Sequence, residues 1–267
     1  MCKAAVLGSP IAHSLSPALH RAAYRYLGLD WDYTAIECTQ AEFPTFFAGL
    51  DDTWRGLSLT MPLKEVVLEV VDQVSALARI VHSANTVYRT DGLSTWQATN
   101  TDVEGMQQAL REAGCELVTA VRILGAGATA RSAVAAMAGL GAKRVVVHAR
   151  RREAAQAIAE LASELGLRCT VADMNPVAGD EDLLVSTLPS DVAAPWARIS
   201  VPPHTALLDA SYHPWPTPLA AAWQARGTAP VASGRDMLIW QAVAQVRLMT
   251  GADFPDEEMA ATMRAVL

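Results

Sequence analysis

The segment from residue 120 to residue 148 constrains the fold more than any other part of the chain. The apolar run Ala120–Leu124 predicts a strand, and Gly-Ala-Gly-Ala-Thr-Ala follows it directly at 125–130. Arg131–Leu140 then predicts an Ala-rich helix, and the Val-rich run Arg144–His148 predicts a second strand. A GxGxx[GA] sequence between a strand and a helix is typical of a Rossmann-type dinucleotide-binding domain.

Each position of this turn has a physical requirement. Gly125 permits the tight turn, Gly127 has no Cβ to obstruct a pyrophosphate, and Ala130 allows close helix–strand packing. The helix N-terminus also offers N–H groups and the positive end of a dipole to an anion. The alternative is a Gly-rich turn that only packs. We expect a pyrophosphate to bind at this turn, Gly125-Ala126-Gly127-Ala128-Thr129.

The end of the second predicted strand indicates which dinucleotide binds. An NAD-binding domain places an acidic residue there, whereas NADP-binding domains often carry Arg for the 2′-phosphate. Here the strand is followed by Ala149 and then by Arg150, Arg151 and Arg152, with no acidic residue before Glu153. Three cations at a helix N-terminus oppose its dipole, so a bound anion explains them better than a solvated basic helix start. The sequence therefore predicts NADP, contacted by Arg150 and Arg151.

Strands alternate with helices along the rest of the chain, which is typical of α/β proteins. We predict two domains: an N-terminal mixed or parallel α/β substrate domain formed by 1–102 with the C-terminal helices at 236–267, and a Rossmann-type NADP-binding domain at 103–235. A hairpin is expected at Thr86–Arg89 and Thr95–Ala98, around a turn at Asp91-Gly92. The other predicted strands are 4–7, 31–38, 56–60, 169–172, 183–187 and 206–209. The other predicted helices are 18–27, 41–49, 63–71, 102–113, 154–165, one ending at 226, 237–249 and 256–267.

Charge and hydropathy exclude several classes of protein. The net charge is −7 and no basic face is evident, which argues against a partner that is a nucleic acid or a membrane surface. No apolar run approaches the roughly 18 residues of a membrane helix, and no N-terminal signal is recognisable, so we expect a cytoplasmic protein. The four cysteines are scattered without metal-ligand spacing, so no metal site is expected. A homodimer is one alternative for the oligomeric state.

Polar clusters follow the predicted strands of the first half. They carry hydroxyls, amides, one cation and one anion, which suits a polyol that also bears a carboxylate. They are Ser14 with Ser16, Thr60 with Lys64, Asn85 with Thr86, and Asn100 with Thr101 and Asp102. Lys64 is one of only three lysines, whereas the chain has 18 arginines. Simpler roles stay open: a solvated charge for Lys64, helix N-caps for Ser16 and Asp102, and core positions for Tyr212, His13 and His20.

Seven ordered motifs resemble the shikimate dehydrogenase family. They are GSPIAHSLSPALH (8–20), LTMPLK (59–64), ANT (84–86), NTD (100–102), GAGATAR (125–131), DASYHPWPTPL (209–219) and GRDMLIWQA (234–242). The resemblance implies NADPH-dependent reduction of 3-dehydroshikimate to shikimate in aromatic amino-acid biosynthesis. It implies Lys64 and Asp102 as the catalytic pair. It implies substrate contacts from Ser14, Ser16, Thr60, Lys64, Asn85, Asp102, Tyr212 and Gln241, and cofactor contacts from Gly125–Thr129, Arg150, Gly234 and Met237.

Two positions depart from the family pattern. Ser58 stands where the family usually has Asn, which predicts a weaker or water-mediated substrate contact. Ala149 replaces the Asn of the cofactor turn while the adjacent Arg150 is kept. A quinate or aminoshikimate dehydrogenase with relaxed substrate or cofactor use stays open. A non-catalytic NADP-binding regulator is the alternative from another class, although it would be expected to have lost Lys64 or Asp102.

Overall fold

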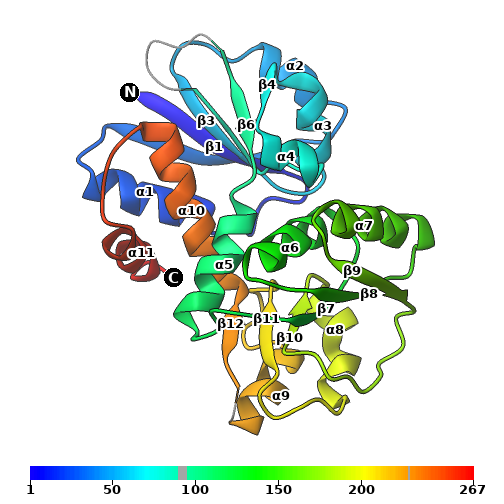
Figure 1. Cartoon of the computed structure of the whole chain (residues 1–267). Helices are drawn as coiled ribbons and strands as arrows, with labels where there is room; N and C mark the ends of the chain where they lie inside the picture. The colour runs from blue at the N-terminus through cyan, green and yellow to red at the C-terminus, as the bar shows by residue number, and fades with distance from the viewer. Residues whose placement is uncertain (90–94, 228) are drawn as a thin grey trace. The chain divides into compact units, whose positions relative to one another are not determined.

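The chain forms two compact α/β units (Figure 1). The computed structural model describes residues 1–89, 95–227 and 229–267. One unit comprises Met1–Thr101 together with Ile239–Leu267, and the other comprises Asp102–Leu238. The predicted α/β class with a Rossmann-type unit is confirmed.

The first unit is built on a mixed six-stranded sheet. Its strands are β1 (Cys2–Gly8), β2 (Trp31–Glu37), β3 (Trp54–Leu59), β4 (Gln73–Val74), β5 (Thr86–Tyr88) and β6 (Gln97–Thr99), in the order β2-β1-β3-β5-β6-β4. β1 pairs in parallel with β2 and β3, whereas β5 pairs antiparallel with β3 and β6. The predicted pairing of the hairpin strands is therefore confirmed, and its predicted turn at Asp91-Gly92 lies outside the described residues. The two-residue strand β4 has too short a pattern to be predicted.

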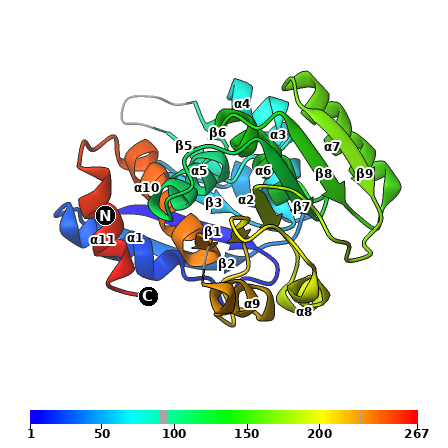
Figure 2. The same ribbon diagram turned by 60° about the horizontal axis from the view of Figure 1, so that its bottom comes forward.

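Helices cover both faces of this sheet (Figures 1 and 2). α2 (Phe43–Ala48), α3 (Leu63–Val70) and α4 (Ala76–Ile80) lie on one face, and α1 (Ser16–Tyr26), α10 (Gly234–Thr250) and α11 (Asp256–Arg264) lie on the other. The strands contribute Leu7 and Leu57 to a core with Phe43 and Leu63 of the first group. On the opposite face α10 approaches β3 closely, because a Cβ on Gly56 would lie 2.4 Å from the Sδ of Met249.

The second unit contains a fully parallel six-stranded sheet. Its strands are β7 (Ala120–Leu124), β8 (Arg144–His148), β9 (Arg168–Ala172), β10 (Leu183–Ser186), β11 (Ala206–Asp209) and β12 (Val231–Ser233). Their spatial order is β9-β8-β7-β10-β11-β12, which is the 3-2-1-4-5-6 order of dinucleotide-binding sheets. The order reverses between β7 and β10, so a ligand crevice is expected where these two strands end.

The helices of the second unit also form two layers. α5 (Asp102–Glu112), α6 (Ala128–Gly139) and α7 (Arg152–Glu164) lie on one face, and α8 (Ser190–Ala193), a 3-10 helix (Ala194–Arg198) and α9 (Pro218–Arg226) lie on the other. Trp196 and Trp223 fill the core of the second layer, where Trp223 Nε1 donates to Thr205 O at 2.8 Å. α6 begins three residues before the predicted Arg131, because the end of the glycine turn is already helical. β12 and the short helices near residue 194 were not predicted.

Across the described ranges, we find no helix that combines the length and the apolar character needed to cross a bilayer.

Candidate active site

The turn after β7 has the geometry that its glycines predict. Gly125 has φ +111°, a left-handed value, and a Cβ there would lie 2.3 Å from Thr187 Oγ1. Thr187 follows β10, and its hydroxyl donates to Leu124 O at 2.8 Å. Conformation and packing therefore both require glycine at 125, and the turn is tied across the point where the strand order reverses.

Neither the backbone conformation nor the packing of the described residues requires glycine at position 127. Its φ of −94° and ψ of −172° are extended values that any residue adopts. A Cβ built on it would meet no atom of the described residues within 4 Å, so it would project into open space. Gly127 is also the N-cap of α6 and provides no side-chain hydrogen bond to the helix. Open space in front of a helix N-terminus is what a pyrophosphate needs, so these residues fit the cofactor that the sequence predicts.

The three arginines after β8 surround the start of α7. Arg150, Arg151 and Arg152 are all exposed. Arg151 is the N-cap of α7 and makes no side-chain capping bond. Within the part of the chain that the structure describes, none of the three side chains has a hydrogen bond or an ion pair. A phosphate monoester would supply the negative charge that this turn lacks.

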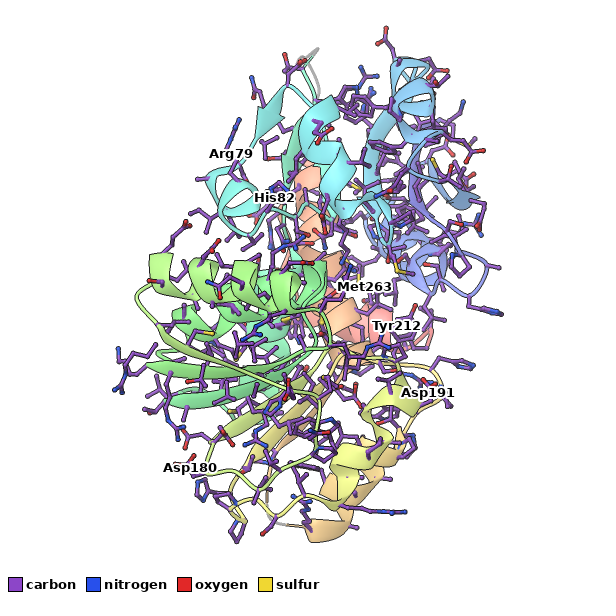
Figure 3. The ribbon with its side chains drawn as sticks, turned by 90° about the vertical axis from the view of Figure 1, so that its right-hand side faces the viewer. Arg79, His82, Asp180, Asp191, Tyr212 and Met263 are labelled. Atoms are coloured by element: carbon purple, nitrogen blue, oxygen red, sulfur yellow. The ribbon has the colours of Figure 1, made fainter. Side chains whose placement is uncertain are left out.

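A buried carboxylate organises the loop that carries Tyr212. Asp209 Oδ2 accepts from Thr217 Oγ1 at 2.6 Å, and Oδ1 accepts from Ser211 N at 3.2 Å. Burial raises the pKa of Asp209, and these hydrogen bonds oppose the rise. Tyr212, labelled in Figure 3, is half-buried, and burial raises the pKa of its hydroxyl.

The start of α10 lies against the same loop. A Cβ on Gly234 would lie 2.4 Å from Ala210 O, so only glycine allows this approach. Met237 is buried almost one turn further along the helix. The structure thus brings Gly234 close to the segment between β11 and Tyr212, and Met237 follows it on the same helix, all within the second unit.

The first unit brings together two amides that the sequence singles out. Asn85 Nδ2 donates to Gln241 Oε1 at 3.2 Å and to Thr101 Oγ1 at 3.0 Å. Asn85 Oδ1 accepts from Thr101 N at 2.7 Å and from Thr86 Oγ1 at 2.8 Å. All four residues are buried, so the amides have fixed orientations.

Lys64 and Thr60 lie at the same edge of this sheet. Thr60 N donates to Leu7 O at 2.9 Å, and Leu59 N donates to Asn85 O at 2.8 Å. Lys64 lies in the first turn of α3, is half-buried, and accepts with its backbone carbonyl from Ala84 N at 2.8 Å. The ends of β1 and β3 and the segment before β5 therefore bring Thr60, Lys64 and Asn85 to one edge of the sheet.

Ser16 is not the N-cap of α1, so that prediction is wrong. The preceding Leu15 is the N-cap and already has near-helical angles, φ −86° and ψ −10°. The hydroxyl of Ser14 accepts instead from Ser16 N at 3.3 Å. Ser16 is the first helical residue and is buried, whereas Ser14 is partly exposed.

A carboxylate at the end of β2 holds the loop that carries these serines. Glu37 Oε1 accepts from Ser9 Oγ at 2.6 Å, and Glu37 Oε2 accepts from Ile11 N at 3.0 Å. The backbone before Ser14 is thereby fixed to the neighbouring strand.

Asp102 is buried and is the first residue of α5, where its carboxylate complements the positive end of the helix dipole. It lies inside the first turn, which differs from the N-cap role that the sequence left open. Asp102 directly follows Thr101 in the sequence, and Thr101 belongs to the hydrogen-bonded cluster around Asn85.

Gln245 is the polar residue that the sequence analysis missed. Its side chain is buried, and its Oε1 accepts from Ser58 Oγ at 2.7 Å and lies 3.2 Å from His20 Nε2. Ser58 in turn accepts from the hydroxyl of Tyr33 at 2.6 Å. The signal was available, because Gln245 follows Gln241 by four residues and so lies on the same helix face.

His20 is a core residue, as one sequence alternative held. Its ring stacks on Tyr33 with centroids 4.0 Å apart, and burial lowers its pKa from 6.5 to about 3. His20 is therefore neutral at physiological pH. His13, the other histidine of this motif, is exposed.

The fold and these side chains define a two-unit α/β protein with a dinucleotide-binding turn in one unit and a buried amide and hydroxyl cluster in the other. Comparison with known proteins agrees with this class. Residues 6–87 match the family model described as the shikimate dehydrogenase substrate binding domain, and residues 234–264 match the shikimate 5'-dehydrogenase C-terminal domain.

Similar proteins span the whole chain. The shikimate dehydrogenase (NADP(+)) of Methanothermobacter thermautotrophicus is 31% identical, over 98% of this chain and 95% of that protein. The crystal structure of shikimate dehydrogenase from Mycobacterium tuberculosis has a TM-score of 0.87 at 41% identity, covering 99% of this chain and 100% of that one. A Thermus thermophilus shikimate 5-dehydrogenase, in complex with NADP(H) and shikimate, has a TM-score of 0.83 at 32% identity and covers 100% of both chains. The chain belongs to the shikimate dehydrogenase family.

Proposed function

We propose that this chain catalyses the reversible, NADP-dependent reduction of 3-dehydroshikimate to shikimate in aromatic amino-acid biosynthesis. The observation that carries the proposal is the similarity over the full chain to a protein solved with NADP(H) and shikimate. This chain also carries the glycine turn, the basic turn and the polar clusters described above. We further propose that the protein acts in the cytoplasm; a homodimer stays a prediction.

We assign substrate binding and catalysis to residues 1–102 with 236–267, and NADP binding to residues 103–235. The compact units divide close to these limits, at Asp102 and after Leu238. α10 runs from Gly234 to Thr250 and crosses the boundary at 235/236, so one helix carries the proposed cofactor residues Gly234 and Met237 as well as Gln241.

The cofactor pocket would use the residues already placed in the second unit. Gly125–Thr129 would receive the pyrophosphate, because Gly127 opens onto free space beside a helix N-terminus. Arg150 and Arg151 would bind the 2′-phosphate, and Gly234 and Met237 would lie near the nicotinamide. When bound, NADPH supplies the hydride.

Substrate contacts are assigned to hydroxyl, amide and charged side chains of the polar clusters. These are Ser14, Ser16, Thr60, Lys64, Asn85, Asp102, Tyr212 and Gln241. Reduction of a ketone produces an alkoxide that must gain a proton, and oxidation requires a base for the same hydroxyl. We assign that proton transfer to Lys64 Nζ and the positioning of Lys64 to Asp102.

The mechanism is tested by Lys64→Ala, with Lys143→Ala as the matched control because Lys143 is an exposed lysine. We expect kcat of Lys64→Ala to fall by about 10²–10⁴-fold, with NADPH binding and the melting temperature retained. The control should keep normal turnover. Near-normal kcat in Lys64→Ala would reject this assignment.

The cofactor assignment is tested by Arg150→Ala, with the exposed Arg168→Ala as the control. Arg150→Ala should raise KM for NADPH about tenfold or more and leave KM for NADH unchanged, because NADH has no 2′-phosphate. Equal effects on both cofactors would show that the arginine does not recognise this phosphate.

Quinate or aminoshikimate remains the alternative substrate. The motif with Ser14 and Ser16 favours shikimate only through the family resemblance. A difference in substrate preference from the family would be expected at Ser58, since its hydroxyl accepts from Tyr33 and donates to Gln245. Measuring kcat/KM on each acid, with NADP and with NAD, separates these activities. Absence of turnover on every acid, with NADP still bound, would favour the regulatory alternative.

A further inference from the structure

We propose that Gln245 is a positioning residue, which holds α10 against the Asn85 segment so that the amides of Asn85 and Gln241 face the substrate in fixed orientations. This inference rests on the proposed function, because it concerns two of the side chains assigned to substrate binding. Gln245 itself would act through them and not touch the substrate.

The orientation of the Gln245 amide follows from its partners. One of its terminal atoms lies 3.2 Å from the backbone oxygen of Asn85, which can only accept, so that atom is the nitrogen. The other terminal atom is then the oxygen, which accepts from Ser58 Oγ at 2.7 Å. The neutral His20 ring, 3.2 Å from the same oxygen, must present its Nε2 as an N–H donor. Every polar atom of this buried amide is therefore paired.

The Gln245 amide also directs the hydroxyl of Thr86. Gln245 Nε2 donates to Thr86 Oγ1 at 3.0 Å. Thr86 then donates its own hydrogen to Asn85 Oδ1 at 2.8 Å. Together with Thr101 N, which donates to Asn85 Oδ1 at 2.7 Å, the Thr86 hydroxyl fixes Asn85 Oδ1 as an acceptor and leaves the Asn85 nitrogen facing Gln241 Oε1 at 3.2 Å.

Two residues of one helix thus hold opposite ends of Asn85. Gln245 binds the backbone carbonyl of Asn85, and Gln241, one turn earlier on α10, binds its side-chain nitrogen. A substitution of Gln245 would remove the hydrogen bond that joins α10 to the backbone carbonyl of Asn85 and the one that orients the hydroxyl of Thr86. The expected consequence is a loss of substrate affinity with little change in the chemical step.

The first experiment is independent of activity. Side-chain amide resonances of Asn85 are followed by NMR in the wild-type protein, in Gln245→Met and in Thr250→Val. Gln245→Met preserves length and removes the amide. Thr250→Val removes a helix-end hydroxyl on α10, which bonds Val246 O at 2.7 Å and lies outside this network. We expect slow hydrogen exchange of the Asn85 amide in the wild type and the control, and at least tenfold faster exchange in Gln245→Met. Unchanged exchange would overturn the proposal.

The second experiment measures steady-state kinetics with shikimate and NADP⁺. Gln245→Met should raise KM for shikimate about tenfold, keep kcat within about threefold, and leave the Kd of NADPH within about twofold. Thr250→Val should change none of these values. A fall in kcat without a rise in KM would contradict a positioning role.

The double variant with Thr86→Val separates positioning from stability. Two facing apolar groups cost less than one unpaired polar group, so Gln245→Met/Thr86→Val should regain part of the melting temperature lost by Gln245→Met. KM should nevertheless stay high, because Asn85 is still not held. Recovery of KM together with stability would mean that Gln245 is only structural. Thr86→Val alone removes the hydroxyl of β5 that connects Gln245 to Asn85 Oδ1, so it replaces Gln245→Met in both experiments if Gln245→Met does not fold. If the wild type does not turn over shikimate, the proposed function fails and so does the substrate role, while the NMR result still decides whether Gln245 orders Asn85.

Discussion

Acid should destabilise this protein through His20, and the size of the effect can be worked out. His20 is fully buried against Tyr33, and its pKa falls from 6.5 to about 3. In the unfolded chain His20 therefore becomes protonated below pH 6.5, whereas in the folded chain it becomes protonated only near pH 3. The contribution of His20 to the free energy of unfolding is fully present above pH 6.5. It decreases as the pH falls below 6.5 and decreases no further below about pH 3. The whole span corresponds to roughly 5 kcal/mol, at about 1.4 kcal/mol per tenfold change in proton affinity.

His20→Phe isolates this contribution, because it keeps a ring on Tyr33 and has no proton to gain. Urea unfolding at pH 7.5 and pH 5.0 gives the free energy of unfolding of both proteins. Between these pH values the wild type should lose about 2 kcal/mol more than His20→Phe. His204→Gln is the control, since the side chain of His204 is 68% exposed; it should follow the wild type. Equal losses in the wild type and His20→Phe would refute a buried neutral histidine.

Three further predictions concern the second unit. Gly127→Val should lower the free energy of unfolding by no more than about 1 kcal/mol, the cost of a poorer N-cap, because its Cβ meets open space. It should nevertheless raise the Kd of NADPH at least tenfold. Gly125→Val should instead lower the free energy of unfolding by about 2 kcal/mol or more, since φ is +111° and the Cβ would meet the neighbouring hydroxyl; tight NADPH binding by the first variant or a normal urea midpoint for the second would contradict this reasoning. Arg122→Met should cost about 3–5 kcal/mol, because it leaves Glu181 buried without its cation, and chemical denaturation of Arg122→Met/Glu181→Gln should recover part of the loss. No recovery would show that the packing of Arg122, not its charge, provides the stability.

The sequence was most informative where local patterns have one physical explanation. The strand, glycine turn and helix at 120–140 predicted a parallel dinucleotide-binding sheet, and the observed strand order has that topology. The hairpin strands, predicted at 86–89 and 95–98 around Asp91-Gly92, pair as antiparallel strands at 86–88 and 97–99. Short elements such as β4 and β12 have too few residues to show a period, so their pairing depends on neighbours distant in sequence.

Helix starts and buried polar contacts were less predictable. Ser16-Pro17 has the composition of a cap and first turn, yet the chain becomes helical one residue earlier because Ser14 accepts from the backbone N–H of Ser16. Gln245 looked like an ordinary helix residue, because its importance depends on Asn85, about 160 residues away in the chain. Such contacts require knowledge of which strand lies beneath which helix face.

The order in which the ribosome delivers the chain bears on how the first unit forms. Its strands are synthesised first, but Ile239–Leu267, which carries most of α10 and all of α11 and covers one face of its sheet, follows the whole of Asp102–Leu238. At ordinary translation rates that delay is on the order of ten seconds. During that time Gly56 lacks Met249, and the buried polar groups around Ser58 lack the amide that pairs with them. The second unit is continuous in sequence and can fold as it emerges, whereas the first is completed only after residues 239–267 have been synthesised. A stop codon that removed residues 239–267 would therefore damage the unit that contains Met1–Thr101 and leave Asp102–Leu238 intact.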